Sequence, residues 1–485
     1  MTPDLLHEAC EWAATLRLAD IPADVLDLAV AQAMSQAAAL QATRRHPVGP
    51  RLAALVEPGG WEQAAASVAL MTMALDFDET AFAGHLGHSC SLPVLACAAA
   101  TGVSGARAMV ASVAASEVAA RVTAAVTLGS ARGQTAAHTH AVGAVVGAAV
   151  VLDLAPETLL TALSLALGQP RRVLLPAFMG SDAKFWVAAT PILDAARAIR
   201  QAQQGARGLD GIMEARGGVL EELADVPLPE ALSGFGDRWH LRTLSIKAIP
   251  GCAYLTSAVE AAAELGPLDL AEVERVEADV SVFTLGMEVQ SAPFLDGPAT
   301  PLPALGFSTG YNLAAALETG GLDVDDLHGE RLGSLDRWRI AGGLRLAHDE
   351  DLTVAALAAT APLGAAVAWA GERARPYLQS HGAGPEMVDR VLLRAAETTD
   401  PGFIRSSKRI GARLRVTLRD GRTLEAEREA AVGCCQESVE ARVALAEDKL
   451  RGQLRRRDGE GARVSRYRRL PELSAAELQE LVQTN

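Results

Sequence analysis

Aromatic residues and cysteine motifs are scarce in this chain. Phe, Trp and Tyr make up only 4% of its 485 residues, and its six cysteines form no C-x-x-C pair. This cysteine spacing argues against a zinc ribbon, an iron–sulfur cluster and a disulfide framework, and it fits buried or idle thiols in a reducing cytoplasm. Apolar residues, mostly Ala, Leu and Val, make up 49% of the chain. This composition favours helices that pack closely through small side chains.

Excess positive charge and long apolar runs are also missing. The net charge is −15, which is the opposite of what a general nucleic-acid binder requires. The longest apolar run, from Ala141 to Val151, is too short to span a bilayer and contains two glycines. The N-terminus has no signal-peptide pattern. No dinucleotide loop, P-loop or G-x-S-x-G elbow is convincing. We therefore predict a cytoplasmic protein that binds a small molecule and neither nucleic acid nor a membrane.

The hydrophobic pattern changes near the middle of the chain. Apolar residues recur at helical spacing over residues 1–242, whereas 273–282 and 410–424 alternate, the second with an Asp420-Gly421 turn typical of a hairpin. We expect strands only in this second half, where helices around 311–318 and 353–378 cover one face of a small antiparallel sheet. The predicted fold is mostly α: a helical domain (1–242), an inserted α+β domain (243–431) and C-terminal helices (432–485) that return to the first domain.

The most informative segment lies between Leu75 and Thr80, where three carboxylates interrupt apolar sequence. Asp76 and Thr80 are four residues apart and would share one face of a helix, with His85 and His88 in the loop beyond. Charged groups beside a core are costly unless they perform chemistry or meet water. The segment is therefore either part of a functional site or a polar helix end that faces water.

Two histidines and two lysines extend this set. His138 and His140 lie on a predicted helix, where their side chains point about 200° apart, so joint metal binding is disfavoured; either could simply be a core histidine. Lys184 and Lys247 stand alone among apolar residues, where a lysine either extends to water or anchors a substrate anion.

Tyr311 is one of only four tyrosines and follows the segment Gly306-Phe307-Ser308-Thr309-Gly310. A tyrosine combines a large apolar ring with a polar hydroxyl. Core packing is its default role, and a place in a functional site is the alternative.

Taken together and in this order, these pieces resemble the MmgE/PrpD family, which includes 2-methylcitrate dehydratase, cis-aconitate decarboxylase and an iminodisuccinate epimerase. The matching elements are the aspartate-rich helix end, the glycine-spaced helix after a histidine, the lysine before a long helix, Lys-x-x-Pro-x-Cys at 247–252 and Phe-Ser-x-x-Tyr at 307–311. The resemblance covers nearly the whole chain. It implies a helical domain with a smaller lid domain, a homodimer, and catalysis without a metal or an organic cofactor.

The chain departs from the family pattern at three places. Ala253 and Thr256 stand where the family has Arg and His after the cysteine, so part of an arginine clamp for carboxylates is missing. The element before the second histidine is altered. The spacing to the first histidine also differs, so that role falls to His88 or to His85, and we prefer His88.

The resemblance implies proton transfer at a carbon next to a carbonyl or carboxylate. The implied roles are proton transfer by His138 and His88, orientation by Asp76, hydrogen bonding by Thr80, and an auxiliary acid at Tyr311. Lys184 and Lys247 would hold substrate anions and stabilise an enolate. We expect a lyase that dehydrates or decarboxylates a small polycarboxylate. The alternatives are an isomerase, epimerase, cyclase or dehydratase for a less anionic biosynthetic intermediate, and a helical scaffold without activity.

Overall fold

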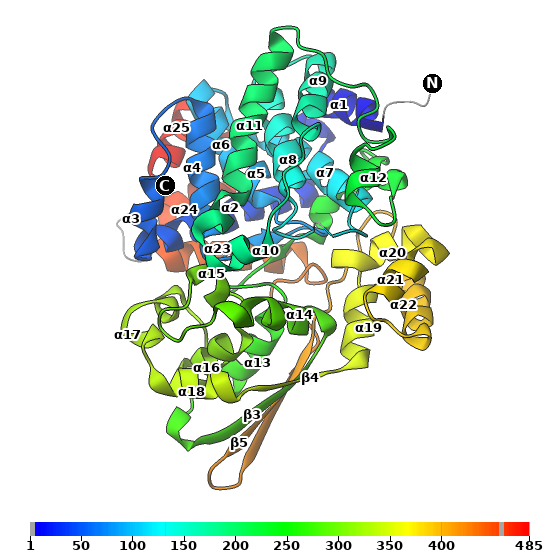
Figure 1. The fold of residues 1–485 in the computed structure, drawn as a ribbon. Coiled ribbons are helices and arrows are strands. Elements are labelled where there is room, and N and C mark those ends of the chain that lie inside the picture. Colours follow the sequence, from blue (N-terminus) through cyan, green and yellow to red (C-terminus); the bar gives the residue numbers. More distant parts are fainter. Residues whose placement is uncertain (1–4, 131, 399, 455–459, 485) are drawn as a thin grey trace.

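The first half of the chain forms a bundle of helices. The computed structural model describes residues 5–130, 132–398, 400–454 and 460–484. Figure 1 shows the bundle in its upper part. Its longer helices are α1 (Leu5–Thr15), α2 (Ala23–Arg45), α4 (Trp61–Met73), α6 (Leu92–Thr101), α7 (Gly105–Ala125), α8 (Ala137–Val151), α9 (Pro156–Leu167) and α11 (Trp186–Gln203). The prediction of a mostly helical protein is confirmed.

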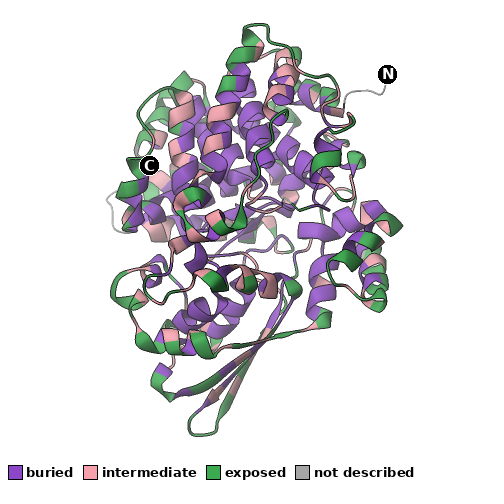
Figure 2. Ribbon diagram, in the orientation of Figure 1, coloured by how far each residue is buried: buried purple, intermediate pink, exposed green. Residues whose placement is uncertain are grey.

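Small residues allow the central helices to pack closely. A Cβ built on Gly143 of α8 would lie 2.3 Å from the sulfur of Cys90, and one on Gly147 would lie 2.5 Å from Val94. Both glycines therefore stand where another helix approaches too closely for any side chain. Figure 2 shows that these central helices are buried nearly all round, as their apolar sequence requires.

One of these buried helices meets the length and hydropathy of a membrane span. α7 passes that test, but its apolar window is completely buried by other helices. It also carries Glu117 and Arg121, which form a buried ion pair at 2.5 Å. The core helix of a globular bundle passes the same test, so α7 is weak evidence for a membrane.

The second half contains a four-stranded sheet with the order β4-β3-β5-β6. Its strands are β3 (Val273–Val280), β4 (Arg345–His348), β5 (Ala412–Leu418) and β6 (Thr423–Arg428). The predicted hairpin is confirmed as β5 and β6, which pair antiparallel with Arg415 opposite Glu425. The prediction of a purely antiparallel sheet is wrong, because β4 pairs parallel to β3 after a long helical crossover.

The predicted helical cover of one sheet face is partly confirmed. α13 (Thr256–Leu265) packs on β5 and β6, and it also contacts α16 (Thr309–Thr319); α18 (Leu335–Gly343) packs on β3. The region 353–378 is not one helix over the sheet. It is divided into α19 (Glu350–Ala358), α20 (Ala365–Ala370) and α21 (Arg375–Ser380), which pack with α22 (Pro385–Thr398) to one side of the strands (Figure 1).

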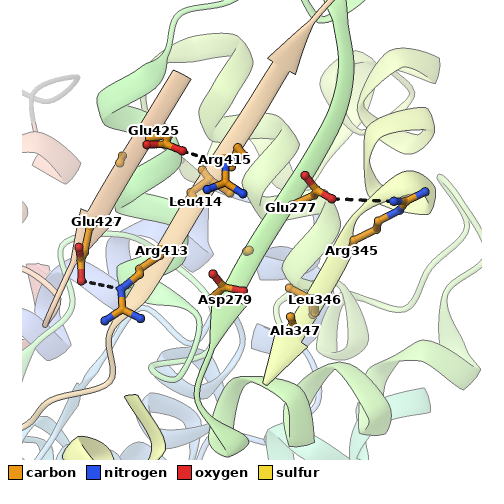
Figure 3. A pocket seen from close by; sticks show the side chains of 12 residues that line it. Glu277, Asp279, Arg345, Leu346, Ala347, Arg413, Leu414, Arg415, Glu425 and Glu427 are labelled. Atoms are coloured by element: carbon orange, nitrogen blue, oxygen red, sulfur yellow. Dashed lines mark hydrogen bonds and ion pairs between the residues drawn. The ribbon is translucent and has the colours of Figure 1, made fainter. Parts of the chain in front are cut away.

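The opposite face of the sheet is solvent-facing and charged. It holds a pocket of about 550 Å³, whose side chains Figure 3 shows. Arg413 and Arg415 each donate to a glutamate of β6 at 2.8 Å. These cross-strand pairs are exposed and match opposite charges in register. These ion pairs explain why charged residues alternate along β5 and β6, so the charged pocket is no evidence of a ligand site.

The chain returns to the bundle at its end. α23 (Val439–Leu454) packs along α2, and α25 (Ala475–Thr484) packs against α6. Two short strands, β1 (Glu79–Thr80) and β2 (Ser245–Ile246), pair antiparallel. The expectation that strands occur only in the second half is therefore wrong for β1. This small pairing matters because it brings the aspartate-rich segment against the residues around Lys247.

Candidate functional site

The aspartate-rich segment is not a helix. α4 ends at Met73, Asp76 has a positive φ of 49°, and Thr80 belongs to β1. The prediction that Asp76 and Thr80 share a helix face is therefore wrong. All three carboxylates are nevertheless buried: Asp76 is 1% exposed, and Asp78 and Glu79 are 0% exposed. The alternative of a polar helix end that faces water is also wrong.

Asp78 is the centre of a buried ionic cluster. Its carboxylate accepts hydrogen bonds from His85 Nδ1 and from Lys247 Nζ, both at 2.5 Å. His88 Nε2 lies 3.1 Å from the same carboxylate, without hydrogen-bond geometry. Burial alone would raise the pKa of Asp78, but His85, Lys247 and His88 outweigh it and hold that pKa well below its usual value.

Asp76 and Lys184, two further residues of the predicted site, are paired with each other. The carboxylate of Asp76 accepts hydrogen bonds from Lys184 Nζ and from the amide of Gln134. The Lys247 ammonium also donates to the backbone carbonyl of Asp76 at 2.7 Å. Lys184 and Lys247 therefore do not extend to water, and both are bound to carboxylates of the protein itself.

Three further buried side chains complete the cluster, and sequence reasoning did not find them. Lys408 donates to the hydroxyl of Thr80 at 2.7 Å. Lys449 donates to the carbonyl of Phe77 at 2.8 Å, and Gln36 donates to Glu79 at 2.9 Å. Burial is the largest cause that raises the pKa of Glu79 to about 7 and lowers that of Lys449 to about 7. Gln36 is a polar residue within an apolar helical pattern, whereas Lys408 lies in the polar segment 405–409 and gave no such signal.

A pocket of about 190 Å³ opens beside this cluster. Its walls come from α10 (Leu175–Gly180), α14 (Val282–Ser291), Ser130 with residues 132–135, and the loop 252–254. Most of the lining is apolar and includes Phe178, Met179 and Phe307. Of the predicted site residues, only His85 lines this pocket. Burial lowers the pKa of His85, although Asp78 partly opposes that shift, so its imidazole is neutral at pH 7.

A second pocket of about 200 Å³ adjoins the first, and each pocket is lined by one tyrosine that the sequence analysis did not select: Tyr254 in the first and Tyr377 in the second. Arg132 lines both pockets and donates to the hydroxyl of Tyr377 at 2.6 Å. Tyr254 lines the first pocket and stacks on Phe283 at 5.0 Å. Burial raises the pKa of Tyr254 to about 12, so its hydroxyl stays protonated.

The structure places the remaining predicted residues away from these pocket walls. Tyr311 is fully buried among α16 and its neighbours, where its hydroxyl donates to the carbonyl of Asp326 at 2.5 Å. His88 is 0% exposed behind His85, in the short helix α5 (Gly87–Cys90) and not in a loop. His138 is buried at the start of α8, and its Nε2 has no hydrogen-bond partner among the residues that the structure describes.

Asp78, His85 and His88 also offer ligand atoms that lie within 4.8 Å of one another. Such a set can in general hold a transition-metal ion. The Lys247 ammonium is 2.5 Å from the same carboxylate, however, and its positive charge repels a divalent cation. The donor set therefore suits hydrogen bonding and proton transfer better than metal binding.

We expect the buried histidines to make folding sensitive to mild acid. Burial lowers the pKa of His138 to about 4, whereas an unfolded histidine has a pKa of about 6.5. As the pH falls from about 6.5 to about 4, His138 binds a proton in the unfolded chain but not in the folded chain, so the free energy of unfolding decreases. Replacing His138→Gln should reduce that loss by about 3 kcal/mol, measured by chemical denaturation between pH 7 and pH 4.

The matched control is His7→Gln, at an exposed position on α1. Its side chain is 57% exposed and lies 3.2 Å from the exposed carboxylate of Glu11, so this change should alter the stability far less than His138→Gln does. An equally steep loss of stability in His138→Gln and in the native chain would contradict the assignment of a buried neutral His138.

The chain matches no family model, and no curated protein matches it. The resemblance to the MmgE/PrpD family therefore depends on the residues quoted above.

Proposed function

We propose that the protein is an enzyme that moves protons at a carbon next to a carboxylate or carbonyl, in the manner of an MmgE/PrpD-like lyase. The observation that carries the proposal is the His85–Asp78 pair at the wall of a largely apolar pocket. A base that is oriented by a carboxylate and placed in a water-poor cavity is the arrangement that general base catalysis requires.

In this proposal His85 is the base. Its Nδ1 donates to Asp78, so the lone pair needed to accept a proton is on Nε2. Asp78 orients the ring and stabilises the imidazolium that forms when the C–H proton is taken. Tyr254, whose hydroxyl stays protonated, is the acid that protonates a leaving hydroxyl or a carbanion. The wall behind these groups is held in place by Asp76, Thr80, Lys184 and Lys247. His88 supports Asp78.

A second candidate is an isomerase, epimerase, cyclase or dehydratase for a less anionic biosynthetic intermediate. Ala253 lines the pocket at the position where the family has arginine. The two lysines that the family resemblance assigns to substrate anions are already paired with Asp76 and Asp78. The pocket wall therefore offers little charge for a tricarboxylate, which favours this candidate over 2-methylcitrate or citrate as substrate. The same family resemblance supports proposals of a homodimer, a lid domain and catalysis without a cofactor.

The test is proton exchange followed by NMR. Purified protein is incubated in D₂O with 2-methylcitrate, citrate, cis-aconitate and a set of monocarboxylates that carry a hydroxyl or a double bond. We expect deuterium incorporation next to a carboxylate in a monocarboxylate, with or without loss of water. Turnover confined to the tricarboxylates would favour the lyase. If no compound exchanges deuterium and none is converted, the enzyme proposal is contradicted and the scaffold is favoured.

A further inference from the structure

The two pockets are joined by a common wall. Arg132, Phe283, Met287 and Gln290 line both of them. Each pocket is also mainly apolar beyond this wall: Phe178, Met179 and Phe307 line the first, and Leu357, Leu363 and Leu378 line the second. A ligand that fills both compartments would therefore place apolar groups on either side of the junction.

Arg132 is the cation at that junction. Among the described residues, no carboxylate lies within ion-pair distance of it, in contrast to Lys184 and Lys247. Its Nη1 donates to Tyr377, and a guanidinium retains further N–H donors in a planar fork that matches a carboxylate. An unpaired charge at an apolar wall is costly, and a bound anion would remove that cost.

We infer that Arg132 binds a carboxylate carried on an internal carbon of the ligand, and that apolar arms on either side of that carbon occupy the two pockets. This inference rests on the proposed function, because it places one arm in the pocket of His85. It narrows the substrate class to a branched monocarboxylate. A terminal carboxylate on a straight chain would leave one compartment without an apolar group.

The class can be tested with two isomers. 2-Propylpentanoate and octanoate have the same atoms, but only the first carries its carboxylate between two apolar arms. We expect 2-propylpentanoate to bind more tightly by at least about tenfold, because each buried methylene adds to affinity. The measurement is a ligand-observed NMR titration of the purified protein. Equal affinity of the two isomers, or tighter binding of octanoate, would overturn the inference.

The role of Arg132 is tested with Arg132→Gln and with the amide 2-propylpentanamide. The variant should bind the carboxylate at least about tenfold more weakly than the native protein does, and should bind the amide equally well. The matched control is Arg345→Gln on the outer face of the sheet (Figure 3), which should not alter either affinity. Unchanged carboxylate affinity in Arg132→Gln would remove Arg132 from the site.

A third variant fills the second pocket without removing a protein contact. Gly286 lines that pocket on α14, and a Cβ built on it meets no atom within 4 Å. Gly286→Leu should therefore fold, and it should weaken 2-propylpentanoate but not acetate. Gly342→Leu on α18, where a Cβ also meets no atom within 4 Å, is the control and should leave both affinities unchanged. Because binding is measured without turnover, the two proposals fail separately. A negative exchange assay would contradict the proposed function but would not change the measured affinities. Undiminished affinity for 2-propylpentanoate in Gly286→Leu would overturn the inference alone.

Discussion

Replacing His85 by glutamine should lower the turnover number for proton exchange by about 10²- to 10⁴-fold, the usual contribution of a general base. His85 is the imidazole at the pocket wall, and Asp78 holds its Nδ1 at 2.5 Å. Glutamine keeps a hydrogen-bond donor for Asp78 but cannot accept a proton near neutral pH. The Michaelis constant should change little, because the anion contact lies at Arg132. Turnover numbers and Michaelis constants are measured by deuterium incorporation.

The pH profile provides the sharper test of His85. Activity of the native protein should fall as the pH drops through the pKa of His85, which burial places below its usual value. That acid limb should disappear from the residual activity of His85→Gln. His138→Gln should lose less than about tenfold, because His138 is not among the residues that line either pocket. A larger loss in His138→Gln than in His85→Gln would move the base back to the histidine that the family resemblance assigns.

Replacing Asp78 by asparagine should destabilise the fold by about 3–5 kcal/mol, as expected when a buried ion pair loses one partner. The variant would leave the Lys247 ammonium buried without its carboxylate, and His85 and His88 without their anion. Replacing both residues, as Asp78→Asn with Lys247→Met, should cost less than the single change because the uncompensated charge is gone. Free energies of unfolding from denaturant titration measure both.

The pH dependence of unfolding below about pH 4 should also depend on Asp78. The pKa of Asp78 is held well below its usual value in the folded chain, so its contribution to stability is present above its unfolded pKa of about 4 and is lost as the pH falls through the folded pKa. Asp78→Asn should remove this loss below about pH 4. The control is Glu425→Gln in an exposed pair on β6, where the cost should stay within about 1 kcal/mol. Equal costs for Asp78→Asn and Glu425→Gln would show that the cluster does not hold the fold together.

Local patterns located much of the architecture. Helical spacing in residues 1–242 and the Asp420-Gly421 turn were sufficient for the bundle and for the β5–β6 hairpin. The direction of β4 was not predictable in this way, because strand pairing across a long crossover depends on contacts between residues far apart in the chain. The same limit explains Asp76: four-residue spacing suggested a helix face, but α4 ends at Met73 and Asp76 has a positive φ. The contact that extends Glu79 and Thr80 is the pairing of β1 with β2, which lie far apart in the chain.

By itself, the sequence determined that ionisable side chains concentrate around residues 76–88 and that two lysines stand in apolar surroundings. Charge in an apolar context is a local property, but the sequence left open whether these groups face water or are buried, and the structure shows that they are buried. Only the tertiary structure decided that Lys184 and Lys247 pair with Asp76 and Asp78, that His85 and not His88 meets the pocket, and that Arg132 lies at its junction. These features depend on contacts between residues far apart in the chain, which set the ion-pair partner of each buried charge and decide which side chains line a pocket.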